Sequence, residues 1–118
     1  MILSSPARRA AQTAELVVQF AAFTAPIRFD ERIYEASPLT LLYLLAETQN
    51  RYSRLLLVGH NPGLEGLIKI LTGRLEAMST AALAEIELNL ESWSEISANR
   101  GNLKSVFRPK DEINFRVA

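Results

Sequence analysis

The chain has 118 residues, of which 48% are hydrophobic and 22% charged, with 13 basic side chains balancing 13 acidic ones. This length is enough for one domain with a hydrophobic core, and we expect residues 1–118 to form a single domain. The neutral balance disfavours a nucleic-acid-binding protein, although a local phosphate site needs only two or three groups. The absence of cysteine excludes disulfides, thiolate nucleophiles and zinc–cysteine sites.

No membrane association is expected from the distribution of hydrophobic residues. The longest apolar stretch, Leu39–Ala46, is interrupted by Thr40 and is far shorter than a membrane span. The N-terminus lacks the basic segment and long apolar run of a signal peptide. We therefore expect a cytoplasmic protein.

The first third of the chain predicts a strand, a helix and a second strand. After the apolar residues Met1–Ser4, Ser5 is placed as an N-cap with Pro6 at the first helical position. A face lined with small residues would let this helix lie close to a sheet. The helix closes at Ala25-Pro26, and Ile27–Ile33 follows as a strand. The small residues at helical spacing are Ala7, Ala10, Ala11, Ala14, Val17, Val18 and Ala21.

The middle third repeats this pattern. Ser37-Pro38 is a second start signal and predicts a helix to about Gln49. The short apolar run Leu55–Val58 is typical of a strand buried on both faces. It ends at Gly59–Gly63, after which a helix with one apolar face runs to Gly73, whose type suits a C′ position.

The last third predicts two more strands. Hydrophobic and polar residues alternate over Ala82–Leu90, which indicates a strand with one wetter face. Gly101-Asn102 predicts a turn and Leu103–Arg108 a final strand, followed by a charged peripheral tail from Lys110. The order of elements indicates an α/β fold of three layers, α/β/α, with a mostly parallel sheet.

Two predicted strand-to-helix loops could carry chemistry, because ligands bind beyond the carboxyl ends of parallel strands. In Ser4–Arg9, a helix N-terminus and arginines could bind an anion. Val58–Gly63 places His60, the only histidine, at an equivalent corner. Each loop also has a purely structural interpretation: Ser-Pro is a common cap, Asn-Pro-Gly is a turn signal, and a lone histidine is often a hydrogen-bonded surface residue.

Both loops resemble signatures of the histidine phosphatase superfamily, whose fold is phosphoglycerate mutase-like. The stretch 4–15, with sequence SSPARRAAQTAE, is similar to its second signature, and 58–64, VGHNPGL, to its later histidine signature. The stretch 32–37, RIYEAS, and the short length point to the SixA-type phosphohistidine phosphatase branch. The resemblance runs from Ile2 to about Asp111.

The resemblance implies roles for two residues. Arg9 is similar to the arginine that clamps the phosphoryl oxygens, and His60 to the second histidine, which stabilises the phosphoryl charge. Arg8 stands where the family varies and is better explained as a solvated helix charge. Such roles suit phosphoryl transfer, which depends mainly on positioning and charge stabilisation. Glu31 and Glu35 are the nearest candidates for a proton donor, although both suit ordinary surface positions.

One part of the family pattern has no counterpart in this sequence. The family opens with a strand bearing an Arg-His-Gly/Ala signature, whose histidine is the nucleophile, whereas His60 already matches the second role. We therefore expect a chain truncated relative to the family, with little or no turnover. The family's sheet order would leave facing edges at Leu55–Val58 and Ala82–Leu90. Three outcomes follow: the edges close directly, two chains exchange strands as a homo-oligomer, or the domain is partly ordered.

The resulting functional expectation is a phosphatase-like domain acting on phosphohistidine in a protein or on a small phosphoester. The alternative is a non-catalytic phosphate-binding or protein-interaction module that retains the corner of Arg9 and His60. A third interpretation is a remnant of the fold that has lost anion binding. No cofactor or metal is implied, since one histidine with scattered carboxylates makes no ligand cluster.

Overall fold

A computed structural model of the chain describes residues 1–21, 24–79 and 82–108. Strands and helices alternate through the first 72 residues, and two strands follow. In chain order the elements are β1 (Ile2–Ser4), α1 (Arg8–Ala21), β2 (Ile27–Phe29), the 3-10 turn η1 (Glu31–Ile33), α2 (Pro38–Ala46), β3 (Leu56–Val58), α3 (Gly63–Thr72), β4 (Leu83–Leu88), the 3-10 turn η2 (Trp93–Glu95) and β5 (Gly101–Phe107).

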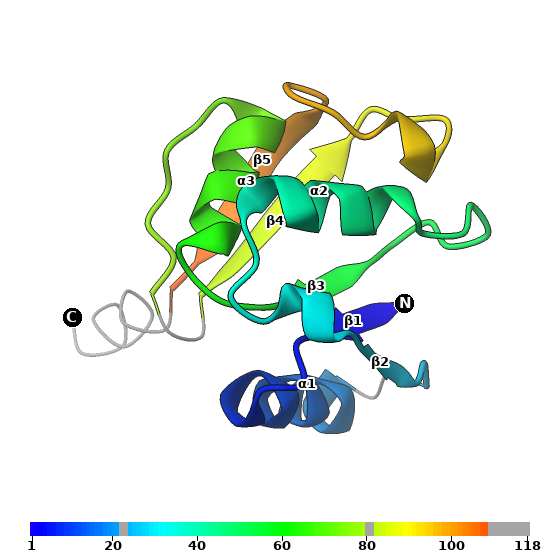
Figure 1. The fold of residues 1–118 in the computed structure, drawn as a ribbon, viewed down its shortest axis with the longest axis vertical. Coiled ribbons are helices and arrows are strands. Elements are labelled where there is room, and N and C mark those ends of the chain that lie inside the picture. The colour runs from blue at the N-terminus through cyan, green and yellow to red at the C-terminus, as the bar shows by residue number, and fades with distance from the viewer. Residues whose placement is uncertain (22–23, 80–81, 109–118) are drawn as a thin grey trace.

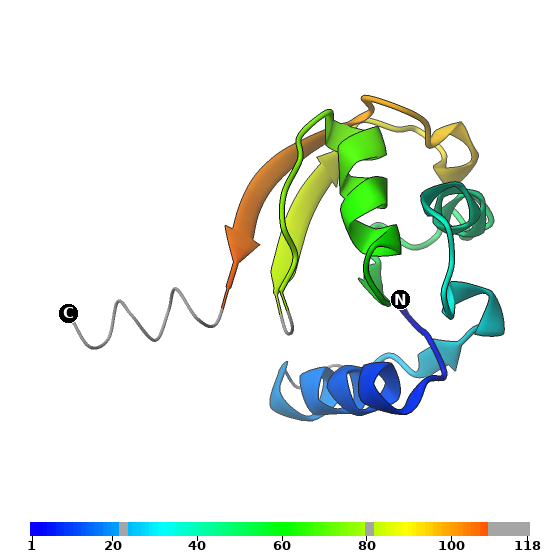
Figure 2. The same ribbon diagram turned by 60° about the vertical axis from the view of Figure 1, so that its left-hand side comes forward.

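The strands form two separate sheets (Figure 1). Sheet A has three parallel strands in the order β2-β1-β3, and sheet B is the antiparallel pair of β4 and β5. Helix α1 packs on one face of sheet A, while α2 lies on the other side and α3 lies against sheet B (Figure 2). The predicted layered α/β fold with a parallel sheet is confirmed. Direct closure of β3 on β4 is not observed, because these strands belong to different sheets.

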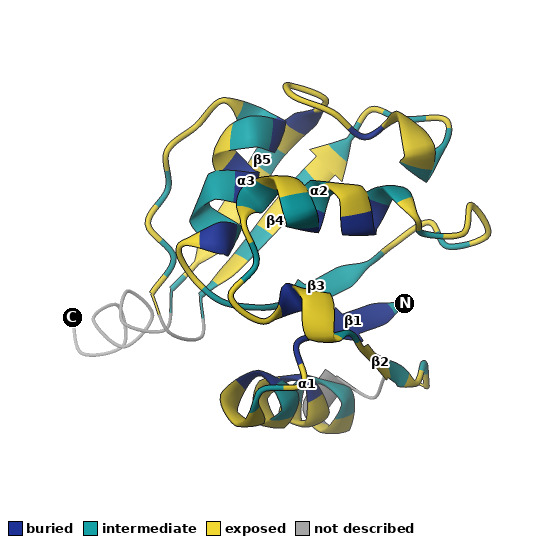
Figure 3. Ribbon diagram, in the orientation of Figure 1, coloured by how far each residue is buried: buried dark blue, intermediate teal, exposed yellow. Residues whose placement is uncertain are grey.

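Helix α1 uses its alanines to approach sheet A. Ala10 and Ala14 are 4% and 0% exposed and form the buried side of the helix (Figure 3). Ser5 caps the turn that leads into α1, because its Oγ accepts the Ala7 N–H at 3.2 Å. Regular helix begins at Arg8 rather than at Pro6. Small side chains let the helix lie close to the strands, as predicted.

The main core lies on the opposite side of sheet A. Here α2 and α3 meet at their N-termini, where glycines permit close approach: a Cβ at Gly66 would overlap Pro38, and one at Gly63 would overlap the Ala36 carbonyl. This contact fixes the two helix starts relative to each other. The buried residues of the core cluster are Leu3, Ile33, Leu41, Leu44, Leu45, Leu67, Leu71 and Ile96.

Two predicted elements are shorter than the sequence indicated. The predicted strand Ile27–Ile33 ends at Phe29, because the Asp30 side chain accepts the Arg32 N–H and starts the turn η1. The helix predicted to extend to about Gln49 ends at Ala46, where a tightened last turn directs the Glu47 N–H to the Leu44 carbonyl. A polar side chain thus ends β2 earlier than the hydrophobic pattern indicated, and a backbone turn does the same for α2.

The prediction that the strand around Leu55–Val58 is buried on both faces is wrong. All residues of β3 are half-buried, because β3 is an edge strand of sheet A and its side chains remain accessible from the open side. By contrast, the prediction of Gly73 as the end of α3 is confirmed: it adopts φ 74° and its N–H donates to the Lys69 carbonyl.

Sheet B also differs in detail from the prediction. Strand β4 is shorter than the predicted Ala82–Leu90, and Gly101 is the first residue of β5 instead of part of a turn. The reversal lies earlier, where Asn99 adopts φ 63°, a left-handed conformation that asparagine tolerates. The predicted tail from Lys110 lies outside the described residues. No helix within those residues is long and apolar enough to cross a membrane.

The two sheets are tied together at the end remote from the α3 N-terminus, around η2. The Trp93 indole donates to the Tyr52 carbonyl at 2.8 Å, and the Asn50 carboxamide accepts the Trp93 N–H at 3.0 Å. The residues before β3 thus hold the segment after β4. This polar junction supplements the hydrophobic core, since no strand pairing links the two sheets within the described part of the chain.

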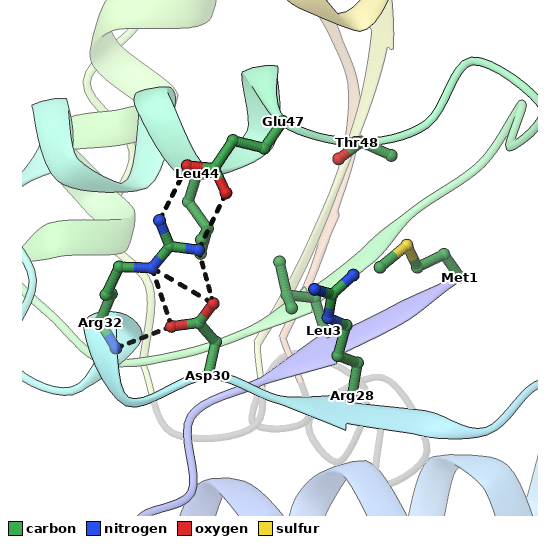
Figure 4. A pocket seen from close by; sticks show the side chains of 8 residues that line it. All are labelled: Met1, Leu3, Arg28, Asp30, Arg32, Leu44, Glu47 and Thr48. Carbon is green, nitrogen blue, oxygen red and sulfur yellow. Dashed lines mark hydrogen bonds and ion pairs between the residues drawn. The ribbon is translucent and has the colours of Figure 1, made fainter.

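A cluster of charges ties η1 to the end of α2 (Figure 4). The Arg32 guanidinium donates to Asp30 Oδ2 at 2.8 Å and to both carboxylate oxygens of Glu47 at 2.8 and 2.9 Å. Hydrogen bonds from Arg32 lower the pKa of both Asp30 and Glu47 below their ordinary values. A small cavity of about 50 Å³ lies beside this cluster.

These lowered pKa values predict an acid-sensitive contribution to stability. The cluster stabilises the folded state above the ordinary carboxyl pKa of about 4 and loses this contribution as the pH falls through the lowered values. We expect Arg32→Met to reduce the fall in Tm between about pH 7 and about pH 3, measured by circular dichroism. Arg54→Met, at another exposed arginine, is the control and should behave like wild type. Equal falls in Tm for Arg32→Met and wild type would contradict this prediction.

Candidate functional site

The two loops singled out from the sequence meet at the carboxyl edge of sheet A. The parallel register of β1 and β3 pairs Ser4 with Val58, and the Ser5 N–H donates to the Val58 carbonyl at 2.9 Å. The next residues, Ser5 and Gly59-His60, therefore leave the sheet side by side. This edge is where ligands bind in parallel α/β sheets.

A hydrogen bond joins the two loops directly. His60 Nε2 lies 2.7 Å from Ser5 Oγ, although the two residues are 55 positions apart in the sequence. Ser5 is fully buried, with 0% of its surface exposed, whereas His60 is half-buried. Helix α3 begins immediately beyond, with the Leu64 N–H donating to the His60 carbonyl at 3.0 Å. The imidazole is thus anchored on its inner side and accessible on its outer side.

Tyr34 holds a second side of the imidazole. The two ring centroids lie 5.7 Å apart at an interplanar angle of 88°, an edge-to-face arrangement that aromatic rings favour. Tyr34 follows η1 directly and precedes Glu35, which adopts φ 50°. A left-handed backbone at a residue other than glycine is uncommon and often marks a functional segment.

A cavity of about 470 Å³ opens beside His60. Its walls come from the residues before α2 and from those before α3, so that both helix N-termini border the cavity. Free N–H groups at helix N-termini favour anions. The lining residues are Glu35, Ala36, Ser37, Pro38, His60, Asn61, Pro62 and Gly63.

The other candidate residues predicted from the sequence lie in different surroundings in the structure. Arg8 and Arg9 both lie exposed in the first turn of α1, and within the part of the chain that the structure describes neither guanidinium makes an ion pair or hydrogen bond. Of the two carboxylates, Glu35 borders the cavity beside His60, whereas Glu31 lies in η1 away from its lining. Asn61 is engaged elsewhere, since its side chain donates to the Met78 carbonyl.

The sequence gives no family-model match and no match to a curated protein. Solved structures do match. A candidate phosphohistidine phosphatase SixA from Nakamurella multipartitia aligns with a TM-score of 0.78 at 18% identity, covering 91% of this chain and 69% of that one. The protein histidine phosphatase SixA complexed with tungstate aligns with a TM-score of 0.77 at 23% identity, covering 94% and 69%.

A candidate SixA from Agrobacterium tumefaciens aligns with a TM-score of 0.68 at 25% identity, covering 92% of this chain and 66% of that one. The chain has the SixA fold. The resemblance inferred from the two signatures is thereby confirmed at the level of fold. The aligned part of the chain spans about two thirds of the length of these proteins.

Two contacts in this corner of the SixA fold were missed by sequence reasoning. Ser5 was interpreted only as a helix cap, and its hydroxyl does accept the Ala7 N–H, but it also bonds to His60. The contact of Tyr34 with His60 has no local signal in the sequence. A lone histidine directly after one apolar strand and a Ser-Pro cap directly after another parallel strand form the pattern that could have indicated the first contact.

Proposed function

We propose that this chain is a SixA-like phosphatase domain whose site at the carboxyl edge of sheet A binds a phosphoryl group. Its substrate class is phosphohistidine in a protein or a small phosphomonoester, and it acts as a single cytoplasmic domain. The proposal is carried by one observation: in a chain with the SixA fold, the only histidine lies anchored at the meeting point of β1 and β3, beside an open cavity.

In this proposal His60 and Arg9 stabilise the phosphoryl group. A guanidinium can donate two parallel hydrogen bonds to phosphate oxygens, and an imidazole N–H can donate a third. Arg9 is available for this role, since its side chain is exposed and unpaired among the described residues. A tetrahedral oxyanion such as tungstate, present in one of the SixA structures above, is a suitable probe.

The proposal includes low or absent turnover by the 118-residue chain. A covalent route requires a nucleophile in addition to the group that stabilises charge, and the single histidine can fill only one of these roles. Glu35 borders the cavity and is the better placed of the two carboxylates for proton transfer. Without a nucleophile, the remaining groups could bind phosphate or assist a slow direct hydrolysis.

The proposal predicts anion binding. Tungstate and inorganic phosphate should bind, and Arg9→Ala should weaken binding about 10- to 100-fold, because a charge-assisted hydrogen bond contributes about 1.5–3 kcal/mol. Calorimetric titration measures this, with Arg8→Ala as the matched control, since Arg8 is an equally exposed neighbour in the same helical turn. Equal affinities of wild type, Arg9→Ala and His60→Ala, or no binding at all, would favour the remnant of the fold.

The proposal also predicts that turnover is absent. The 118-residue chain should hydrolyse neither an aryl phosphate nor a phosphohistidine peptide above the rate of His60→Ala, measured by phosphate release. Anion binding without turnover would favour the alternative function, a phosphate-binding or interaction module. Hydrolysis at an ordinary enzymatic rate that disappears in His60→Ala would overturn the expectation of inactivity.

The open edges of the two sheets support a further part of the proposal, association of two copies. Among the described strands β3 pairs only with β1, and β4 only with β5, which leaves each with an edge free to pair. An exposed edge of this kind is a template for another chain. We propose a homo-oligomer formed through these edges.

Sedimentation velocity at several concentrations tests this association. We expect a dimer whose fraction falls in Leu83→Lys, because a charge at the start of β4 opposes edge-to-edge pairing. Asn102→Lys is the control, since it adds the same charge on β5, the neighbouring strand of sheet B. A compact monomer at all concentrations would argue against strand exchange.

A further inference from the structure

The hydroxyl of Ser5 is in an unusually constrained position. A serine hydroxyl has one proton to donate and two lone pairs that can accept. In this chain one lone pair accepts the Ala7 N–H at 3.2 Å, and the remaining contact of Oγ is His60 Nε2 at 2.7 Å. Ser5 has 0% of its surface exposed, so water does not provide a further partner.

These hydrogen-bond partners of Ser5 Oγ determine which group donates in the contact between Ser5 and His60. If Nε2 carried a proton, it would donate to the second lone pair of Ser5, and the hydroxyl proton would be buried without an acceptor among the described residues. Leaving a buried donor unpaired is unfavourable. If the hydroxyl donates instead, Ser5 Oγ accepts from Ala7 and donates to His60, and its proton is satisfied.

We propose that Ser5 is a positioning residue that holds neutral His60 in the tautomer protonated at Nδ1, with Nε2 accepting from the serine hydroxyl. The two ring nitrogens point to opposite sides of an imidazole, so the remaining N–H is directed away from Ser5. The edge-to-face contact with Tyr34 restricts rotation of the ring at the same time. Ser5 thus caps the turn before α1 and orients the histidine with one atom.

The inference specifies the chemistry of the site, and in this respect it rests on the proposed function. With Nε2 occupied by Ser5, the ring offers Nδ1–H as its donor to a ligand in the adjoining cavity. A donor fixed in this way suits an anionic oxygen of a phosphoryl group, because its orientation is set before the ligand binds. A ligand that requires an acceptor on the imidazole would not be suited.

Nuclear magnetic resonance of the ring nitrogens tests the tautomer. Because the chain has one histidine, labelling with ¹⁵N-histidine gives a single pair of ring signals that need no assignment by mutation. At a pH where the ring is neutral, we expect Nε2 to resonate as an unprotonated nitrogen and Nδ1 as a protonated one. The reverse pattern, or averaged shifts that indicate both tautomers, would overturn the proposal.

Two variants separate this role from simple capping. Ser5→Ala should move the Nε2 shift toward that of a protonated nitrogen, and Ser5→Thr, which keeps a hydroxyl, should restore the wild-type pattern. Thr72→Ala removes a hydroxyl that also accepts the N–H two residues further on, from Arg74 at 3.2 Å, but at the C-terminal end of α3 and outside the cavity lining, and it should leave the ring shifts of His60 unchanged. An unchanged pattern in folded Ser5→Ala would overturn the proposal, and the wild-type spectrum decides the question if that variant does not fold.

Adding tungstate to the labelled protein distinguishes this inference from the proposed function. A shift of the Nδ1–H signal on titration supports both. The Nδ1–H tautomer without any response to tungstate supports the positioning role of Ser5 and counts against the phosphoryl site. The reverse tautomer overturns the positioning role, whether or not the anion binds.

Discussion

The parallel pairing of β1 with β3 is the constraint on which the site depends. Its register sets Ser4 beside Val58, so the chain leaves both strands at one level and Ser5 meets His60. A slip by one residue would shift the loops by about 3.3 Å along the strands and would break a 2.7 Å contact between them. Packing of Leu3 in the core and of the α1 alanines on the sheet maintains this register.

Much of the fold follows from local signals in the sequence, whereas the contacts in the site do not. The start of α2 after Ser37, the end of α3 at Gly73 and the loop position of His60 were predictable, because caps, glycine and an apolar run act over a few residues. The bond between Ser5 and His60 spans 55 positions, and its existence depends on the strand register. The end of β2 was missed because Asp30 caps a turn inside an apolar pattern.

Strand β3 is half-buried and the two sheets are separate because β3 is not paired with β4. A strand that carries a continuous apolar run is suited to the middle of a sheet, yet β3 has a neighbour on one side only. Its outer edge adjoins the loop that bears His60, so the unpaired backbone and the candidate site lie next to each other. Any chain that paired with β3 would therefore run close to the imidazole.

The junction around Trp93 has a practical consequence for observing this molecule. Trp93 is the only tryptophan, and its indole joins the segment after β4 to the residues that lead into β3. Its fluorescence therefore reports whether the two sheets remain docked, at a place remote from the imidazole. An optical signal from Trp93 would follow separation of the two halves, while the single histidine would follow events at the other end of the same strand. The chain thus contains two natural reporters, one for its architecture and one for its chemistry.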